Sequence, residues 1–298
     1  MAAIVRAGDF PQGGAVVLTT FDGYWDALSA AGLAGLVQAP VLMTHGNALS
    51  TQTADLLAKL APKTIVVCGG VDAVSDGVAS AAASAAGNAR LIRRAGQTAT
   101  DTACAVFESD IPDARGRWAS DAFVCTNEGE WDALAAAPLS YSLHMPIFMT
   151  EGASDISNAT LECMVEGGVE RAYIVGGREA VSETVADKLA AAGIVVADRL
   201  WGQEACETSA KVAEFGVSQG LLADGLGVAT TNGYWDALAG ASFCGMRDSV
   251  AVLVDGPQAA SIPGFVAQHA DDIADVYVFG GASAVSEQTR ATIASAAR

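Results

Sequence analysis

The sequence lacks several features that would place it in a common class of proteins. It has no run of roughly 20 strongly apolar residues, the length that a membrane-spanning helix needs, so no membrane span is expected. Met1 is not followed by a basic segment and an apolar run, so no signal peptide is visible in the chain. Basic residues are few, 16 against 34 acidic ones, and the net charge of −18 disfavours binding to nucleic acid because the protein repels phosphate.

Patterns that hold metals, phosphates or cofactors are missing as well. The six cysteines form no Cys-x-x-Cys pair and show no metal-ligand spacing, so we expect neither a metal nor a cofactor. We interpret them as buried free thiols, and one or two disulfides remain open if the protein is exported. The chain also has no Gly-x-Gly-x-x-Gly sequence and no phosphate-loop lysine motif.

The chain does contain one unit that is repeated three times. Segments 24–28, 130–134 and 234–238 share the phrase Trp-Asp-Ala-Leu, and Trp25, Trp131 and Trp235 are spaced by 106 and 104 residues. A Gly-Gly pair follows each tryptophan after 44 or 45 residues. A unit of about 105 residues is large enough for its own core. The repeats predict domains at 1–112, 113–219 and 220–298, the last without a fourth strand and helix.

Strands alternate with helices inside each unit. In the second unit, apolar runs at 122–126, 146–150, 171–175 and 194–200 predict four strands. The segments 132–143, 157–165, 182–192 and 207–215 predict the helices that follow them, with Gly193 as a C-terminal cap. Continuous apolar strands with helical crossovers are typical of a parallel sheet covered on both faces. The expected fold class is therefore α/β, with short linkers at 111–116 and 220–225 that favour a pseudo-threefold arrangement.

The first and third units differ from the second in completeness. The third unit ends after its third helix, and the segment 2–6 has the repeat position of 103–107. We therefore expect the chain to begin inside a fourth helix whose strand lies upstream, so that it is either a fragment or a chain whose start codon is misassigned.

The repeated phrases resemble the type 2 cell-wall-binding repeat of Gram-positive surface proteins. Asp-Ala-Leu at 26–28, 132–134 and 236–238 matches its first motif, with Trp in place of Pro. Segments 40–44 and 146–150 match its Pro-to-Thr strand, and segments 69–75, 176–182 and 280–286 match its Gly-Gly to Ala-Val-Ser motif. A fourth motif, Arg-x-x-Gly, occurs at Arg93 and Arg199. The resemblance covers nearly the whole chain.

The resemblance implies a fold, a partner and a location. Units of that family occur in threes, have a Toprim-like α/β fold and form a triangular module. They attach exported proteins non-covalently to anionic polymers of the cell wall. The chain is thus expected to be a non-catalytic anchor at the cell wall or extracellular surface. Its expected partners are an anionic wall glycopolymer and the neighbouring repeats of the same chain.

Two departures from the family pattern concern ligand binding. The family's Arg-Tyr pair is replaced by Ala99-Thr100 in the first unit and by Ala205-Cys206 in the second. The third unit has the segment 250–255 where the Pro-to-Thr strand is expected. If the family arginines hold wall phosphates, this chain binds its polymer differently, more weakly or not at all.

The repeated aspartates and tryptophans each have two interpretations. The repeated aspartates, Asp26, Asp132 and Asp236, lie between the end of the first strand and the start of its helix. They are either ligand groups at the carboxyl end of the sheet or acidic residues that stabilise a helix N-terminus. The tryptophans either stack on sugar rings or fill the gap to a neighbouring unit.

Four further sets of residues are candidates for ligand contacts. The second glycines of the pairs expose backbone donors at a strand-to-helix turn, which is either a phosphate cradle or only a tight turn. Arg93 and Arg199 are the best local cations, for phosphate, for carboxylate or for an ion pair between units. The remaining candidates are the glycines three residues after these arginines and the threonines at the end of the second strand. The sets are Gly70, Gly177 and Gly281; Arg93 and Arg199; Gly96 and Gly202; and Thr44 and Thr150.

Two rival hypotheses remain open beside wall anchoring. One is a small-molecule or nucleotide enzyme that uses the diverged third unit, at 255–257, as its active site. The other is a structural surface scaffold with no ligand, which the missing Arg-Tyr pairs favour. His45, His144 and His269 fall at unrelated repeat positions, so no catalytic residue is assigned.

Overall fold

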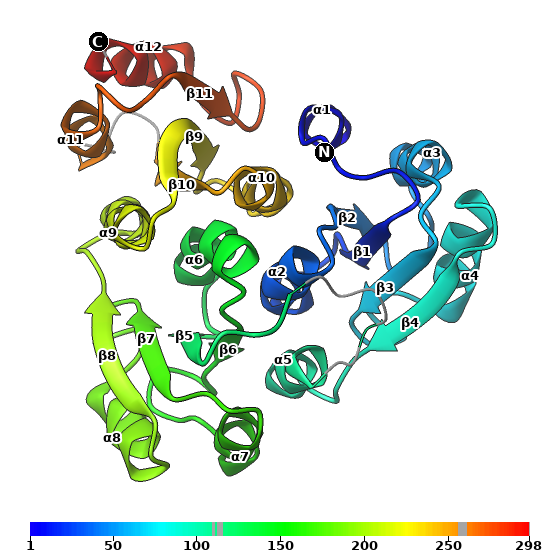
Figure 1. Cartoon of the computed structure of the whole chain (residues 1–298), viewed down its shortest axis with the longest axis horizontal. Coiled ribbons are helices and arrows are strands. Elements are labelled where there is room, and N and C mark those ends of the chain that lie inside the picture. The colour runs from blue at the N-terminus through cyan, green and yellow to red at the C-terminus, as the bar shows by residue number, and fades with distance from the viewer. Residues whose placement is uncertain (109–110, 112–115, 256–260, 298) are drawn as a thin grey trace.

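Each of the three units forms its own parallel sheet, and the sheets surround a common set of central helices (Figure 1). The computed structural model describes residues 1–108, 111, 116–255 and 261–297. The expected linker residues 112–115 and the diverged pair Gly256-Pro257 lie outside this part of the chain. The predicted α/β class with three parallel-sheet units in a pseudo-threefold arrangement is confirmed.

Most strands are short and almost completely buried, as their continuous apolar sequences predict, whereas β4, β8 and β11 are partly exposed. All the strand pairings are parallel. The sheet orders are β2-β1-β3-β4, β6-β5-β7-β8 and β10-β9-β11. The strands are β1 (Ala15–Thr20), β2 (Val41–Thr44), β3 (Thr64–Cys68), β4 (Arg90–Arg94), β5 (Asp121–Cys125), β6 (Ile147–Met149), β7 (Arg171–Val175), β8 (Val195–Leu200), β9 (Leu222–Thr230), β10 (Ser249–Val254) and β11 (Asp275–Val278).

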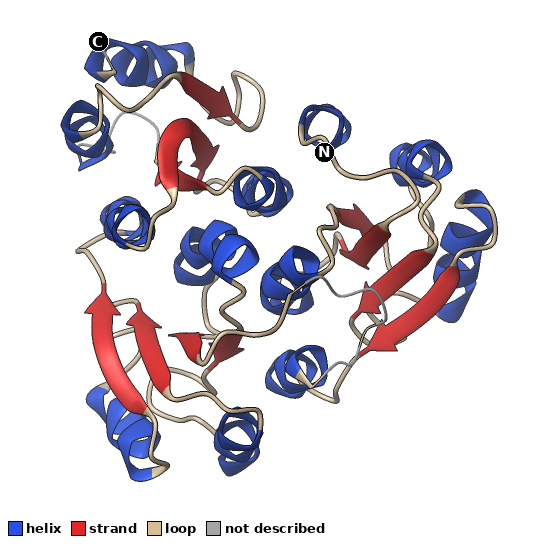
Figure 2. Cartoon of the chain, viewed as in Figure 1, coloured by secondary structure: helices blue, strands red, loops and turns tan. Residues whose placement is uncertain are grey.

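Helices lie on both faces of the sheets (Figure 2). One helix of each unit faces the centre of the molecule: α2 (Trp25–Leu36), α6 (Trp131–Leu143) and α10 (Trp235–Met246). The outer helices are α3 (Thr51–Leu60), α4 (Asp76–Ala85), α7 (Asn158–Glu166), α8 (Glu183–Ala191), α11 (Ser261–Gln268) and α12 (Glu287–Ala296). Among the described residues, no helix is long and apolar enough to cross a membrane.

The remaining helices join the units into a ring. Helix α5 (Ala99–Phe107) packs on α2 of its own unit and on β6 and α7 of the second unit. Helix α9 (Ala205–Ser218) in the same way packs on α6 and on β10 and α11 of the third unit. Helix α1 (Ala2–Ala7) contacts α10 and α3, so it lies at the third junction as α5 and α9 lie at the other two.

The central helices approach one another through small side chains. Ala31, Ala137 and Ala241 occupy the same repeat position and form one buried cluster. Gly35 lies so close to α6 that a β-carbon there would come within 1.9 Å of the Tyr141 carbonyl oxygen. A β-carbon at Gly245 would likewise come within 2.4 Å of the Tyr141 side chain. Larger residues would therefore push the units apart.

We expect Gly35→Ala to destabilise the whole assembly, since the methyl group would meet backbone rather than a movable side chain. The free energy of unfolding should fall by about 1–3 kcal/mol or more. Gly77→Ala, in helix α4, is the matched control, because a β-carbon there meets only the Ser75 hydroxyl at 3.9 Å. It should raise stability by about 0.5–1 kcal/mol. Chemical denaturation of both variants tests this, and equal stabilities would contradict it.

Candidate ligand-binding site

The repeated aspartate lies in the first turn of its central helix and packs against the first glycine of the Gly-Gly turn. A β-carbon on Gly69, Gly176 or Gly280 would come within 2.4–2.6 Å of the aspartate Oδ2 atom. The same three glycines have φ angles of +103° to +116°, a region that side chains disfavour. Asp26, Asp132 and Asp236 are thus enclosed by the turn at the carboxyl end of their sheets.

Burial changes the acidity of the repeated aspartate in the first two units. It raises the pKa of Asp132 to about 6, and it also raises the pKa of Asp26, where a hydrogen bond from Thr102 acts in the opposite direction. None of the three central helices has a side-chain hydrogen bond at its N-cap position, which is Tyr24, Glu130 or Tyr234. The aspartates lie in the first turn of their helices and are therefore not the N-cap residues.

Arg93 and Arg199 hold the Gly-Gly turn in place from the neighbouring strand. The Arg199 guanidinium donates to the carbonyl oxygens of Gly176 at 3.1 Å and Val181 at 2.7 Å. Arg93 donates to the matching carbonyls of its unit, at 2.8 and 2.9 Å. Their carboxylate partners, Asp76 at 3.0 Å and Glu183 at 3.3 Å, belong to the same unit, so these ion pairs do not join two units.

A different arginine makes the same contacts in the third unit. Arg290 of helix α12 donates to the Val285 carbonyl oxygen at 2.9 Å and to the Gly280 carbonyl oxygen at 3.0 Å. The equivalent helix positions in the other units are Ala79 and Ala186. The repeat pattern could not reveal Arg290, because its repeat position carries no arginine elsewhere.

Most of the remaining predicted site residues, glycines and threonines, stabilise loops near the carboxyl ends of the strands. The Gly96 and Gly202 amides each donate to a threonine hydroxyl on the following helix at 3.0 Å. A β-carbon on either glycine would come within 2.1–2.2 Å of the next acidic side chain. The buried hydroxyls of Thr44 and Thr150 donate to carbonyl oxygens of their own loops, at 3.0 and 2.6 Å. A β-carbon on Gly70 would have no neighbour within 4 Å.

In the second unit, residues of these turns and of α6 line an open cavity of about 860 Å³. Four predicted residues line it together: Asp132, Gly177, Arg199 and Gly202. Two tryptophans, Trp131 and Trp201, also line it, whereas Thr150 does not. Trp201 was not among the predicted site residues. The one clue in the sequence is that the two units differ at this repeat position, where the first unit has Ala95.

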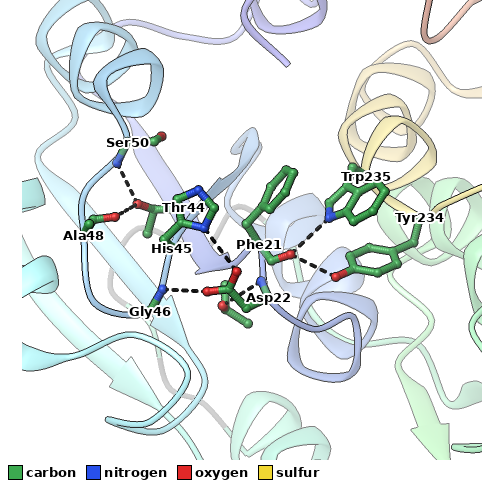
Figure 3. Close-up of polar contacts among 10 residues, drawn as sticks. Phe21, Asp22, Thr44, His45, Gly46, Ala48, Ser50, Tyr234 and Trp235 are labelled. Atoms are coloured by element: carbon green, nitrogen blue, oxygen red, sulfur yellow. Dashed lines mark hydrogen bonds and ion pairs between the residues drawn. The ribbon is translucent and has the colours of Figure 1, made fainter. Parts of the chain in front are cut away.

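The tryptophans of the other two units join neighbouring units, and Figure 3 shows this for Trp235. The Phe21 carbonyl oxygen accepts hydrogen bonds from the Trp235 indole at 3.0 Å and from the Tyr234 hydroxyl at 2.9 Å. The rings of Phe21 and Trp235 stack with centroids 5.1 Å apart. The Trp25 indole donates to the Asn127 carbonyl oxygen of the second unit at 3.1 Å. The expected packing between units is therefore observed, although Trp25 and Trp235 remain 42% and 39% exposed.

Beside this junction, Asp22 fastens the loop that follows β2. Its carboxylate accepts a hydrogen bond from the Gly46 amide at 3.0 Å and contacts the His45 ring at 3.1 Å (Figure 3). These two bonds hold the pKa of Asp22 below its ordinary value. His269 contacts Glu214 elsewhere in the chain, at 3.1 Å, so the histidines do not meet at one site.

Carboxylates converge at one cavity of the second unit. Of the segment 255–257, where the enzyme hypothesis placed an active site, Gly256 and Pro257 lie outside the described residues. Within the described part of the chain, no group of three His, Cys, Asp or Glu side chains is placed to hold a metal ion.

The profile of a family described as cell wall binding domain 2 (CWB2) matches residues 2–79, 93–186 and 199–290. The chain belongs to this family. The second and third matches each begin in the last strand of one unit and continue into the next unit. They therefore include α5 and α9, the helices that pack on the next unit. The resemblance of the repeated motifs is thereby confirmed, and the CWB2 chain is a cell-wall-binding module located at the cell wall or cell surface.

Two curated relatives come from Bacillus subtilis. The CWB2 chain is 29% identical to the N-acetylmuramoyl-L-alanine amidase LytC over 78% of its own length and 44% of that protein. It is also 29% identical to an amidase enhancer, over 80% of its own length and 31% of that protein. The chain therefore spans less than half of the length of either relative.

Two solved structures from Clostridium difficile share the fold. Cwp8 superposes with a TM-score of 0.82 at 22% identity, over 99% of the CWB2 chain and 49% of Cwp8. Cwp6 superposes with a TM-score of 0.77 at 20% identity, over 91% of the CWB2 chain and 42% of Cwp6.

We expect Asp132→Asn to stabilise the CWB2 chain more as pH rises. The folded-state pKa of about 6 lies above the ordinary value of 3.8, so the ionised carboxylate is disfavoured by folding. Both states are neutral at low pH, and wild-type stability is lost as pH rises from about 4 to about 6, by up to about 3 kcal/mol. The stability difference between variant and wild type, measured by denaturation across this range, should grow with pH. Parallel profiles would rule out a buried, ionising Asp132.

We expect Arg290→Gln to loosen the turn of the third unit, because two carbonyl oxygens lose a charged donor. The free energy of unfolding should fall by about 1–3 kcal/mol, with faster amide exchange at 281–285. The control is Arg178→Gln, since the Arg178 side chain is 75% exposed and its pair with Glu183 lies on the surface. The control should change stability by less than about 1 kcal/mol, and equal losses would refute the proposed role of Arg290.

Proposed function

We propose that this CWB2 chain is a non-catalytic module that holds an exported protein on the cell wall through an anionic wall glycopolymer. The observation that carries the proposal is the cavity of the second unit, where Asp132, Gly177, Arg199 and Gly202 meet at the carboxyl end of the sheet. Open α/β sheets usually bind ligands at this end. A glycopolymer suits the site because sugar hydroxyls pair with its polar groups.

Net charge limits how an anionic polymer can approach. The chain carries −18 overall, so a polyanion is repelled except where cations are concentrated. Arg178 and Arg199 line the cavity, and Lys211 lines a neighbouring groove of about 450 Å³. We assign the charged groups of the polymer to the groove of Lys211, and its contacts in the first unit to Arg93, Gly96 and Gly70.

The partial overlap with longer relatives supports an anchoring role. Both curated relatives are more than twice as long as the matched region, and their names describe an amidase and an amidase enhancer. In the proposed function, the CWB2 chain keeps such an activity near its wall substrate and adds no chemistry of its own. Contacts in several units raise the residence time through avidity.

A second candidate is a scaffold without a ligand. The specific observation in its favour is that Arg93, Arg199 and Arg290 already donate to carbonyl oxygens of their own units. Trp25 and Trp235 likewise bond across unit junctions. In this case the arginines serve only to hold the turns of their own units, and the tryptophans to hold neighbouring units together.

We expect the CWB2 chain to sediment with purified cell walls and to lose this retention after the anionic polymer is stripped chemically, because the polymer is its proposed ligand. The bound fraction is measured by pelleting walls with a fixed amount of protein. Equal retention on both wall preparations would refute the polymer as partner. Failure of folded protein to bind either preparation would favour the scaffold.

A further inference from the structure

We infer that one uncharged sugar ring of the wall polymer stacks on Trp201 at the edge of the second unit, and that stacking, not ion pairing, dominates the affinity. The inference rests on the proposed function, because it names how the same polymer is recognised. It assigns the contact to the second unit alone. An uncharged hexose or N-acetylhexosamine is the chemical class that fits this site.

The Trp201 side chain is both held in place and accessible to a ligand. It directly follows the edge strand β8, and it is 47% exposed. Its ring lies against the Gly177 turn, where a β-carbon would come 3.5 Å from the Trp201 Cε3 atom. The turn therefore supports the indole while much of its surface stays free. A large aromatic side chain held in this way offers contact area at little cost in conformational entropy.

A second tryptophan and a small residue line the same cavity as Trp201. Trp131, from the start of α6, lines the same cavity as Trp201. Ala205, at the position of the family arginine, is another lining residue. A small residue here leaves room that a longer side chain would fill, so the cavity can admit a ring beside the two indoles.

The charges of the cavity favour an uncharged ligand group. Arg178 and Arg199 both contact the carboxylate of Glu183, at 2.6 and 3.3 Å. The carboxylates outnumber these two guanidiniums, and they accept hydrogen bonds from sugar hydroxyls while repelling phosphate. They are Asp132, Glu179, Glu183, Asp198 and Glu204.

Trp201 also lies between two hollows, as a polymer site requires. Trp201, Asp198 and Arg199 border both the cavity of about 860 Å³ and the groove of about 450 Å³ that contains Lys211. A polymer can therefore enter on one side of the indole and leave on the other. The ring that crosses Trp201 stacks, and a charged group further along can reach Lys211.

The first unit lacks this tryptophan, because Ala95 stands at the position of Trp201. The remaining contacts of the two units correspond closely: both have the buried aspartate, the Gly-Gly turn and its arginine. The pair of units is thus an internal comparison in which the aromatic residue differs.

The experiment compares Trp201→Ala, Trp201→Phe and the control Val195→Ala, which removes a 60% exposed side chain from the other end of β8. Binding to purified walls of the source strain is measured at low and high sodium chloride, and thermal denaturation checks that each variant is folded. We expect Trp201→Ala to bind about tenfold more weakly or worse, whereas Trp201→Phe and Val195→Ala stay within about threefold of wild type. High salt should change wild-type affinity by less than about threefold, because stacking is not screened.

The outcomes separate failure of the stacking contact from failure of the proposed wall binding. Wild-type affinity that collapses in salt, or folded Trp201→Ala that binds as wild type does, overturns the stacking contact and leaves wall binding intact. If Trp201→Ala unfolds, Trp201→Phe decides: a folded Trp201→Phe variant that binds about tenfold more weakly than wild type would leave no role for a stacking aromatic ring. Wild-type protein that binds no wall at all refutes the proposed function, and this inference with it.

Discussion

The close packing of the three central helices is the constraint on which the rest of the structure depends. Each helix is buried on nearly all sides, so it can have no large polar face, and its sequence is accordingly rich in alanine and glycine. Ala31, Ala137 and Ala241 meet at the centre, and Gly35 lets two helices approach to backbone contact. Because α1, α5 and α9 each bridge two units, the sheets are held in one ring rather than as separate domains.

The same compactness explains the repeated motifs at the carboxyl edge. A central helix that starts at the sheet places its first-turn aspartate against the turn that ends the neighbouring strand (β3, β7 or β11), and only glycine leaves room for it. Burying the carboxylate costs stability, which the raised pKa of Asp132 records. An arginine then ties the turn by its carbonyl oxygens, from β4 or β8 in two units and from α12 in the third. The motif is therefore a structural joint that also forms the floor of the second unit's cavity.

Much of this could be predicted from the sequence because it is periodic. The strand expected at 171–175 has the bounds of β7, the helix expected at 132–143 continues through Pro138, and Gly193 adopts the positive φ of a helix end. Asp132, Gly177, Arg199 and Gly202 do meet at one cavity. Trp201 and Arg290 were not predicted because neither residue recurs at its repeat position. The direction of each side chain depends on local structure, on the end of β8 for Trp201 and on the face of α12 for Arg290.

The sequence by itself determined that three similar α/β units follow one another and that they belong to a wall-binding class, since repeat spacing and motif order are properties of the chain. Only the tertiary structure decided what each repeated residue does. Three equivalent tryptophans have unequal roles, because Trp25 and Trp235 bond across junctions while Trp131 lines a cavity with Trp201. Contacts between units are made by residues far apart in sequence, so identical phrases acquire different surroundings.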